Sequence, residues 1–185
     1  MGFSLEMLAC PLDQKARFLG NAGVTLEGAV DPFSVRLAAA DTPSHFVLLQ
    51  NLRPYATYRE PDYARLSDGV DLAVLTVVDS AGAQELHGMR DGVDTWEVSF
   101  LDTNDDFLAV TGPVPVNVDP LIAAEREKFV DPDAPDTDSI AFYGGGVPGE
   151  AFRALTGVDY ETPHEFEFRD IKGELPRPKP WWRFW

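Results

Sequence analysis

The sequence has very little cysteine and few basic side chains, and both shortages exclude classes of protein. Its single cysteine, Cys10, excludes an internal disulfide and any CxxC metal or redox motif. Only 15 lysines and arginines stand against 31 aspartates and glutamates, which gives a formal net charge of −16. Contact with nucleic acid phosphates or an anionic membrane needs a basic surface. We therefore expect neither a nucleic acid nor a membrane as a partner.

Long apolar runs and targeting segments are also missing. No stretch approaches the ~20 apolar residues of a membrane-spanning helix. The first ten residues carry Glu6 as their only charge, so they lack the basic segment of a secretory signal. We expect a cytoplasmic protein.

What the sequence does contain is enough apolar material for a packed core. Apolar residues make up 44% of the 185 residues and aromatic residues 11%, unlike a disordered chain. The length predicts a single domain over residues 1–175, followed by a Pro/Trp-rich tail over residues 176–185.

The middle of the chain predicts an antiparallel sheet. Residues 95–100 alternate apolar and polar side chains, and Asp91-Gly92 just before them is a strong hairpin signal. We expect an α+β fold whose sheet has about five or more strands. Strands are predicted over residues 45–52, 71–78, 84–90, 95–100, 107–111, 139–143 and 164–168.

Two or three short helices are expected to flank this sheet. Pro120 can occupy the first turn of a helix that continues through residues 121–129. A second helix is predicted over residues 148–155 and ends at Gly157. Residues 1–44 give a mixed pattern, in which residues 34–40 fit a short helix or a strand.

The segment Gly144–Gly149 reads GGGVPG and literally matches the dinucleotide-binding pattern GxGxxG. It follows a predicted strand and precedes a predicted helix, and Asp170 lies at a distance suited to a ribose-binding carboxylate. However, no βαβ unit precedes it and only 36 residues follow it. A flexible strand-to-helix turn explains the glycines as well.

Two aspartate-rich segments invite a metal-binding interpretation. Asp102-Thr-Asn-Asp-Asp106 begins like a calcium loop, but Phe107 and Pro113 stand where glycine and glutamate are needed. Residues 131–138 carry four aspartates and could bind a divalent ion weakly, although an exposed acidic loop is the simpler interpretation. We expect no metal and no cofactor.

No set of residues indicates a particular chemistry. His164-Glu-Phe-Glu lacks the second histidine of HExxH, and neither a GxSxG elbow nor a Walker A sequence occurs. His45 and His87 fall in predicted strands, where a structural histidine is the base expectation. We single out no catalytic residue and expect a protein without enzymatic activity.

The charge is unevenly spread along the chain. Residues 60–138 contain 19 acidic and 4 basic residues. Solubility alone could explain this. The alternative is an acidic face that steers the protein towards a basic protein partner. The candidate contact residues on that face are Asp102, Asp105, Asp106, Asp131, Asp133, Asp136 and Asp138.

The last ten residues are unusual because they gather large aromatic side chains. Soluble proteins rarely leave such a patch exposed, so the tail either folds back or docks on a partner or a second copy. Its aromatic residues are Trp181, Trp182, Phe184 and Trp185.

Three segments carry a resemblance to known proteins. Residues 91–98, 107–113 and 148–159 resemble a poorly characterised set of bacterial cytoplasmic α+β proteins, some of which look like immunity proteins of toxin systems. The similarity covers roughly residues 85–170. It implies a stoichiometric inhibitor and gives no catalytic residues.

Three functions therefore stay open. The first is a protein-binding module, most plausibly an immunity-type neutraliser whose acidic surface covers a basic site on a toxin. The second is a structural or assembly component, such as a phage or secretion-system protein, that docks through its tail. The third is a small enzyme or nucleotide-binding domain that uses the glycine turn.

Overall fold

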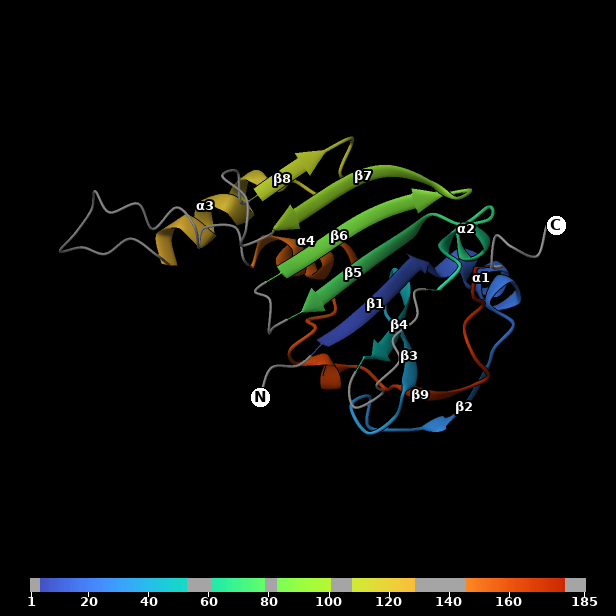
Figure 1. Ribbon diagram of the computed structural model, residues 1–185. Coiled ribbons are helices and arrows are strands. Elements are labelled where there is room, and N and C mark those ends of the chain that lie inside the picture. Colours follow the sequence, from blue (N-terminus) through green and yellow to red (C-terminus); the bar gives the residue numbers. More distant parts are fainter. Residues whose placement is uncertain (1–3, 53–60, 79–82, 101–107, 129–145, 179–185) are drawn as a thin grey trace.

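A computed structural model describes residues 4–52, 61–78, 83–100, 108–128 and 146–178. It shows a nine-stranded, fully antiparallel sheet in the order β2-β9-β3-β4-β1-β5-β6-β7-β8 (Figure 1). The strands are β1 (Ser4–Pro11), β2 (Thr25–Ala29), β3 (Leu37–Asp41), β4 (His45–Asn51), β5 (Leu72–Val78), β6 (Ala83–Arg90), β7 (Val93–Phe100), β8 (Leu108–Thr111) and β9 (Arg169–Lys172). The helices are α1 (Lys15–Ala22), α2 (Tyr63–Leu66), α3 (Asp119–Lys128) and α4 (Val147–Thr156), with short 3₁₀ turns η1 (Leu12–Gln14) and η4 (Pro163–Glu165).

The predicted α+β class with an antiparallel sheet is confirmed. Strands β4 to β8 and helices α3 and α4 lie where the sequence patterns indicated. The hairpin between β6 and β7 turns at Asp91 and Gly92, whose φ angles are 52° and 77°. Both angles are positive, as a tight two-residue hairpin turn requires.

One local prediction differs from the structure. Residues 164–168 were expected to form a strand, but Pro163–Glu165 is a 3₁₀ turn and β9 begins only at Arg169. Phe166 has extended backbone angles, and Phe168 enters the core, so the alternating pattern reflects an extended approach to β9. The predicted strand over residues 139–143 lies outside the described residues.

The sequence pattern did not predict strand β1, which lies in the middle of the sheet between β4 and β5. Leu5, Met7 and Ala9 face one side of the sheet, and Leu8 faces the other. Glu6 lies on the same side as Leu8 and is fully buried. Its carboxylate interrupts the apolar run that would otherwise indicate a central strand.

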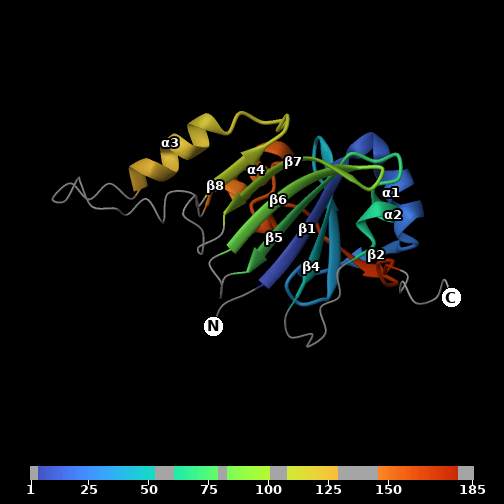
Figure 2. The same ribbon diagram turned by 45° about the horizontal axis from the view of Figure 1, so that its top comes forward.

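Each face of the sheet has its own apolar core. On one face, α4 packs Val147, Ala151 and Phe152 against the centre of the sheet. On the other face, α1 and α2 cover β1, β4 and their neighbours, with the Phe18 and Phe46 rings 5.8 Å apart. Helix α3 and β8 lie at one end of the molecule, and α1, α2 and β2 at the other (Figure 2). The two ends of the sheet are therefore covered by different elements.

Candidate functional site

The contact residues proposed from the sequence cannot be placed in the structure. Asp102, Asp105, Asp106, Asp131, Asp133, Asp136, Asp138, Trp181, Trp182, Phe184 and Trp185 all lie outside the described residues. Their chain neighbours are described, however. Residues 101–107 connect β7 to β8, residues 129–145 connect α3 to α4, and the tail follows Pro178.

The described part of the glycine segment serves packing at the start of α4. A Cβ on Gly146 would collide with the Glu125 carboxylate, and one on Gly149 would collide with the Tyr160 ring. The Gly149 N–H donates to Gln84 Oε1 at 3.1 Å. A carboxylate therefore lies where a dinucleotide phosphate would have to approach this helix. The close packing accounts for both glycines.

The net charge is concentrated in one segment of the sequence. Residues 83–161, called the acidic end below, comprise β6, β7, β8, α3, α4 and their connections. They contain 17 acidic and 4 basic residues, a net charge of −13. The rest of the chain contains 14 acidic and 11 basic residues, a net of −3. Seven of the 17 acidic residues lie in 101–107 and 129–145, outside the described residues, and the described remainder of the segment contains 10 acidic and 4 basic residues.

Ion pairs occur in both parts of the chain. Away from the acidic end, Asp41 pairs with Lys15 at 2.6 Å and with Arg169 at 3.2 Å, and Lys172 lies 3.5 Å from Glu27. At the acidic end, several carboxylates form no ion pair with the described residues. These are Asp94, Glu97, Asp119, Glu127, Asp159 and Glu161. Their charge is available to a partner.

A groove of about 160 Å³ at this end brings four carboxylates together. Among the described residues that line it, Arg153 is the one basic residue, and its Nη1 lies 3.7 Å from the Glu150 carboxylate. Burial and the neighbouring Glu161 raise the pKa of Tyr160 to about 12, so its hydroxyl stays protonated and donates to Glu161. The lining residues are Glu125, Gly146, Gly149, Glu150, Arg153, Asp159, Tyr160 and Glu161.

Strand β8 is the outermost strand of the sheet at the acidic end. Its four residues, Leu108–Thr111, carry no charge, and Val110 is 40% exposed. On the neighbouring strand, Val93 is 63% exposed. An uncharged edge strand offers its backbone for pairing with another chain. The acidic end thus presents an apolar edge beside its carboxylates.

A second cavity, of about 360 Å³, opens on the face of the sheet that α4 covers in part. We call it the sheet cleft. Cross-strand register explains why there is space: Ala9 pairs with Ala73, Ala73 with Gly88, and Gly88 with Trp96. Ala9 and Ala73 leave a low floor beside the bulkier next row of Met7, Leu75 and Leu86, and the Trp96 ring lies over Gly88 at the end of the row. The lining residues are Ala9, Pro11, His45, Asp71, Leu72, Ala73, Met89, Thr95, Trp96, Pro115 and Leu155.

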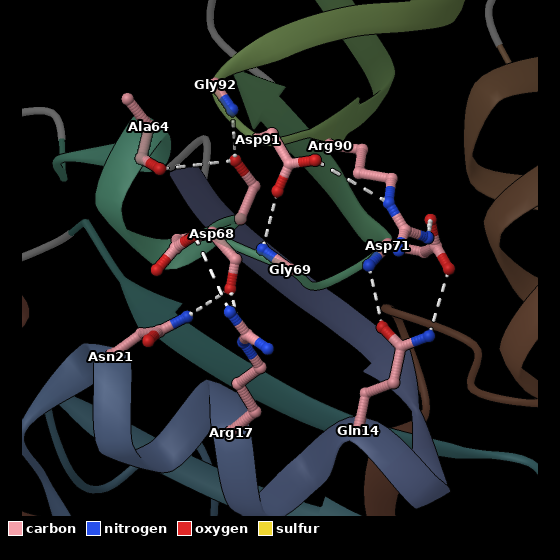
Figure 3. A network of polar contacts seen from close by, with 11 residues as sticks. Gln14, Arg17, Asn21, Ala64, Asp68, Gly69, Asp71, Arg90, Asp91 and Gly92 are labelled. Carbon is pink, nitrogen blue, oxygen red and sulfur yellow. Dashed lines mark hydrogen bonds and ion pairs between the residues drawn. The ribbon is translucent and has the colours of Figure 1, made fainter.

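Polar contacts fix Asp71 at the rim of the sheet cleft (Figure 3). Gln14 both donates to Asp71 Oδ2 at 2.9 Å and accepts from the Asp71 backbone N–H at 2.7 Å. Arg90 donates to Oδ1 at 2.6 Å. The Gln14 hydrogen bond, followed by Arg90, lowers the pKa of Asp71 below its usual value. The carboxylate is therefore ionised and already balanced by an arginine.

The same network attaches the β6–β7 hairpin to the helices on the opposite face (Figure 3). The Gly69 N–H donates to Asp91 Oδ1 at 2.6 Å, and the Gly92 N–H donates to Ser67 Oγ at 2.8 Å. Arg17 and Asn21 of α1 both donate to the carbonyl of Asp68, at 2.8 and 2.9 Å. These bonds join α1, the α2–β5 loop and the hairpin into one unit that holds the rim in place.

The reactive side chains are placed in ways that limit their chemistry. Burial raises the pKa of Cys10 to about 12, so its thiol is protonated and a poor nucleophile. Burial lowers the pKa of His45, which leaves the ring neutral near pH 7. Among the described residues, no group of three or more His, Cys, Asp or Glu side chains is placed to hold a metal ion. In the same part of the chain, no helix is long and apolar enough to cross a membrane.

Sequence reasoning overlooked the residues of the sheet cleft. Ala9, Ala73 and Gly88 are individually ordinary and lie on three different strands, so only the register brings them together. The alternating pattern of residues 95–100 includes Trp96. Gly88 lies opposite Trp96 on the neighbouring strand, and its lack of a side chain is the feature that lets the Trp96 ring lie across the sheet.

Comparison with known proteins gives no relative. No protein-family model, no curated protein and no solved structure matches this chain. The resemblance to immunity-type proteins stays an expectation from the sequence.

Proposed function

We propose that this protein is a non-enzymatic binding module that neutralises a basic protein, most plausibly a bacterial toxin, in the cytoplasm. The acidic end is the contact surface, and binding covers a basic active site or groove on the partner. The observation that carries the proposal is the concentration of charge: a net of −13 on residues 83–161 against −3 on the rest.

Electrostatics supports the acidic end as the surface that contacts a basic protein. Carboxylates without an internal partner lose water on binding and gain an opposite charge, so a basic surface is their natural complement. Charge complementarity of this kind raises association rates above the neutral range and weakens as salt rises. Away from the acidic end, Asp41 and Glu27 already pair with basic side chains, so these two carboxylates offer less of this complementarity.

The surroundings of these carboxylates suit a protein partner. The uncharged β8 edge and the exposed Val93 and Val110 provide apolar contact area next to the charges. The two aspartate-rich connections proposed from the sequence join β7 to β8 and α3 to α4, so both begin and end within the acidic end. The candidate surface therefore combines steering charge with a strip of backbone and apolar side chains.

The test is a capture experiment with matched charge reversals. Full-length protein is immobilised beside a triple variant of the acidic end, Asp94→Lys, Glu97→Lys and Glu127→Lys. A control triple, Asp13→Lys, Glu165→Lys and Glu167→Lys, changes the net charge equally elsewhere on the surface. None of the six side chains forms an ion pair with the described residues.

We expect a basic protein to be captured at low salt by the wild type and the control, and to be lost with the acidic-end triple. Its on-rate should fall at least ~10-fold in that triple. The captured protein is then expressed with and without this chain, and rescue of growth identifies it as a toxin. Equal capture by both triples would overturn the role of the acidic end.

A chain that ends at Pro178 separates this proposal from assembly through the tail. Leu175 is buried, and the Asp62 N–H donates to the Pro176 carbonyl at 2.7 Å, so this truncation keeps the described contacts. The neutraliser proposal expects the shortened chain to capture the same partner. Salt-resistant capture that requires the tail would favour an assembly component instead.

A further inference from the structure

We propose that the sheet cleft binds a small, uncharged, planar aromatic ligand that packs against Trp96. The proposal concerns a surface separate from the groove and edge used above. It rests on the shape of the floor, the position of the indole and the charge balance of the lining.

The floor is shaped for a flat group. Ala9 and Ala73 lie opposite one another on β1 and β5, and their short side chains form a low floor. The cavity of about 360 Å³ lies at the lower end of the ~300–1,000 Å³ typical of ligand pockets. A small ligand that is wide in the plane of the sheet fits such a floor.

The aromatic wall is fixed in place. The Trp96 ring lies over Gly88 so closely that a Cβ on Gly88 would overlap it. Thr95, next to it in the chain, donates its hydroxyl to the Gly88 carbonyl at 3.0 Å at the bulge in this strand pair. Leu155 of α4 and Pro115 complete the apolar lining. Aromatic rings in such surroundings gain from ring–ring contact beyond the burial of area.

The lining is electrically balanced, which selects against a charged ligand. Among the described residues of the lining, Asp71 is the one charged residue, and Arg90 and Gln14 already hold both of its carboxylate oxygens. His45 is neutral near pH 7 because burial lowers its pKa. A charged ligand would lose its hydration without gaining an opposite charge.

One polar group of the ligand has a defined partner. The Ser44 hydroxyl lies 2.9 Å from His45 Nδ1, so Nε2 is the ring nitrogen left for a ligand. Within the described residues, Nε2 has no hydrogen-bond partner. A single hydroxyl or amine on the aromatic ligand can therefore bind at this rim while the rings cover the alanines.

The experiment titrates three bicyclic probes into the ¹⁵N-labelled full chain and follows the indole N–H of Trp96 by NMR. The probes are the uncharged 2-naphthol, the anionic 2-naphthoate and a cationic naphthylmethylammonium. The Trp96 signal is assigned with Trp96→Phe. We expect saturable shifts with 2-naphthol and at least ~10-fold weaker binding of both charged probes.

Two cavity-filling variants and one matched control complete the test. Ala73→Leu places a larger side chain on the floor of the sheet cleft. If that variant does not fold, Leu155→Phe is used instead, because it narrows the cleft from the side of α4. Ala124→Leu introduces the same side chain at an exposed position of α3, outside the cleft. The filled variant should weaken 2-naphthol binding at least ~10-fold, and Ala124→Leu should not change it.

Each contrary result overturns the proposal. These results are the absence of a saturable Trp96 shift with 2-naphthol, equal binding of the charged probes, and undiminished binding by a folded filled variant.

Discussion

Replacing Gly88 with alanine is expected to destabilise the protein, although glycine-to-alanine changes in strands normally stabilise. The usual gain is roughly 0.5–1 kcal/mol, because alanine has less backbone freedom to lose on folding. At Gly88 the new Cβ would overlap the Trp96 ring. Overpacking of this kind costs about 1–3 kcal/mol. The overlap is the larger effect, and the net loss should be about 1–2 kcal/mol.

Thermal unfolding gives the sign directly. For a domain of this size, 1 kcal/mol corresponds to roughly 2–4 °C in Tm, so Gly88→Ala should lower Tm by about 2–8 °C. The matched control is Gly20→Ala in α1, where a Cβ would have nothing within 4 Å. That variant should raise Tm by about 1–4 °C, since an exposed helix favours alanine by up to ~1 kcal/mol.

Tryptophan fluorescence tests the cause of the destabilisation. With the three tail tryptophans replaced by phenylalanine, Trp96 is the only tryptophan of the chain. Gly88→Ala should then shift the emission of the folded protein to longer wavelength, because the indole must move away from the sheet. An unchanged spectrum together with a Tm at or above the wild-type value would refute the reasoning.

Three further predictions follow from single side chains. Phe152→Ala should reduce the free energy of unfolding by ~3–5 kcal/mol in denaturant titrations, because its ring is fully buried beneath the sheet. Asp71→Asn should cost less than ~1 kcal/mol at pH 7, because the Asp71 side chain is half-exposed. Folding lowers the pKa of Asp71, mainly through the hydrogen bond from Gln14 and then through Arg90. The ionised carboxylate therefore stabilises the folded protein above the unfolded-state pKa, and this stabilisation is lost as pH falls through the folded-state pKa. The difference between this variant and the wild type should therefore begin to shrink near pH 4 and continue to shrink as the pH falls further, and a difference that does not change with pH would contradict the assigned cause. Cys10, whose pKa is raised to about 12 by burial, should react with iodoacetamide at pH 8 only after unfolding.

The predictable part of the fold is the run of strands from β4 to β8. Their alternating or β-branched patterns and the Asp91-Gly92 turn are local signals, and local signals are what a single sequence carries. Strand β1 was not predictable because Glu6 interrupts its apolar pattern. The Glu6 carboxylate can be buried in the sheet only because distant residues contact it, as the Tyr63 hydroxyl does through a 2.5 Å hydrogen bond.

The candidate surfaces were predictable to different degrees. Excess acid in the middle of the chain was evident from composition, and the structure adds that β6, β7 and β8 are neighbours at one edge of the sheet. The sheet cleft was not predictable, because it depends on which residues of β1, β5 and β6 lie opposite one another. Register is set by the pairing of distant strands and has no local signature.

The position of β9 between β2 and β3 has a consequence for the order of folding. β9 pairs with both strands, so β2 joins the sheet only through a segment far away in sequence. Contacts at such separation form late, because the chain between them must be ordered first. We expect β3, with three consecutive alanines, to be a temporary open edge during folding. Chaperones and proteases would meet the newly made chain at that edge before β9 closes it.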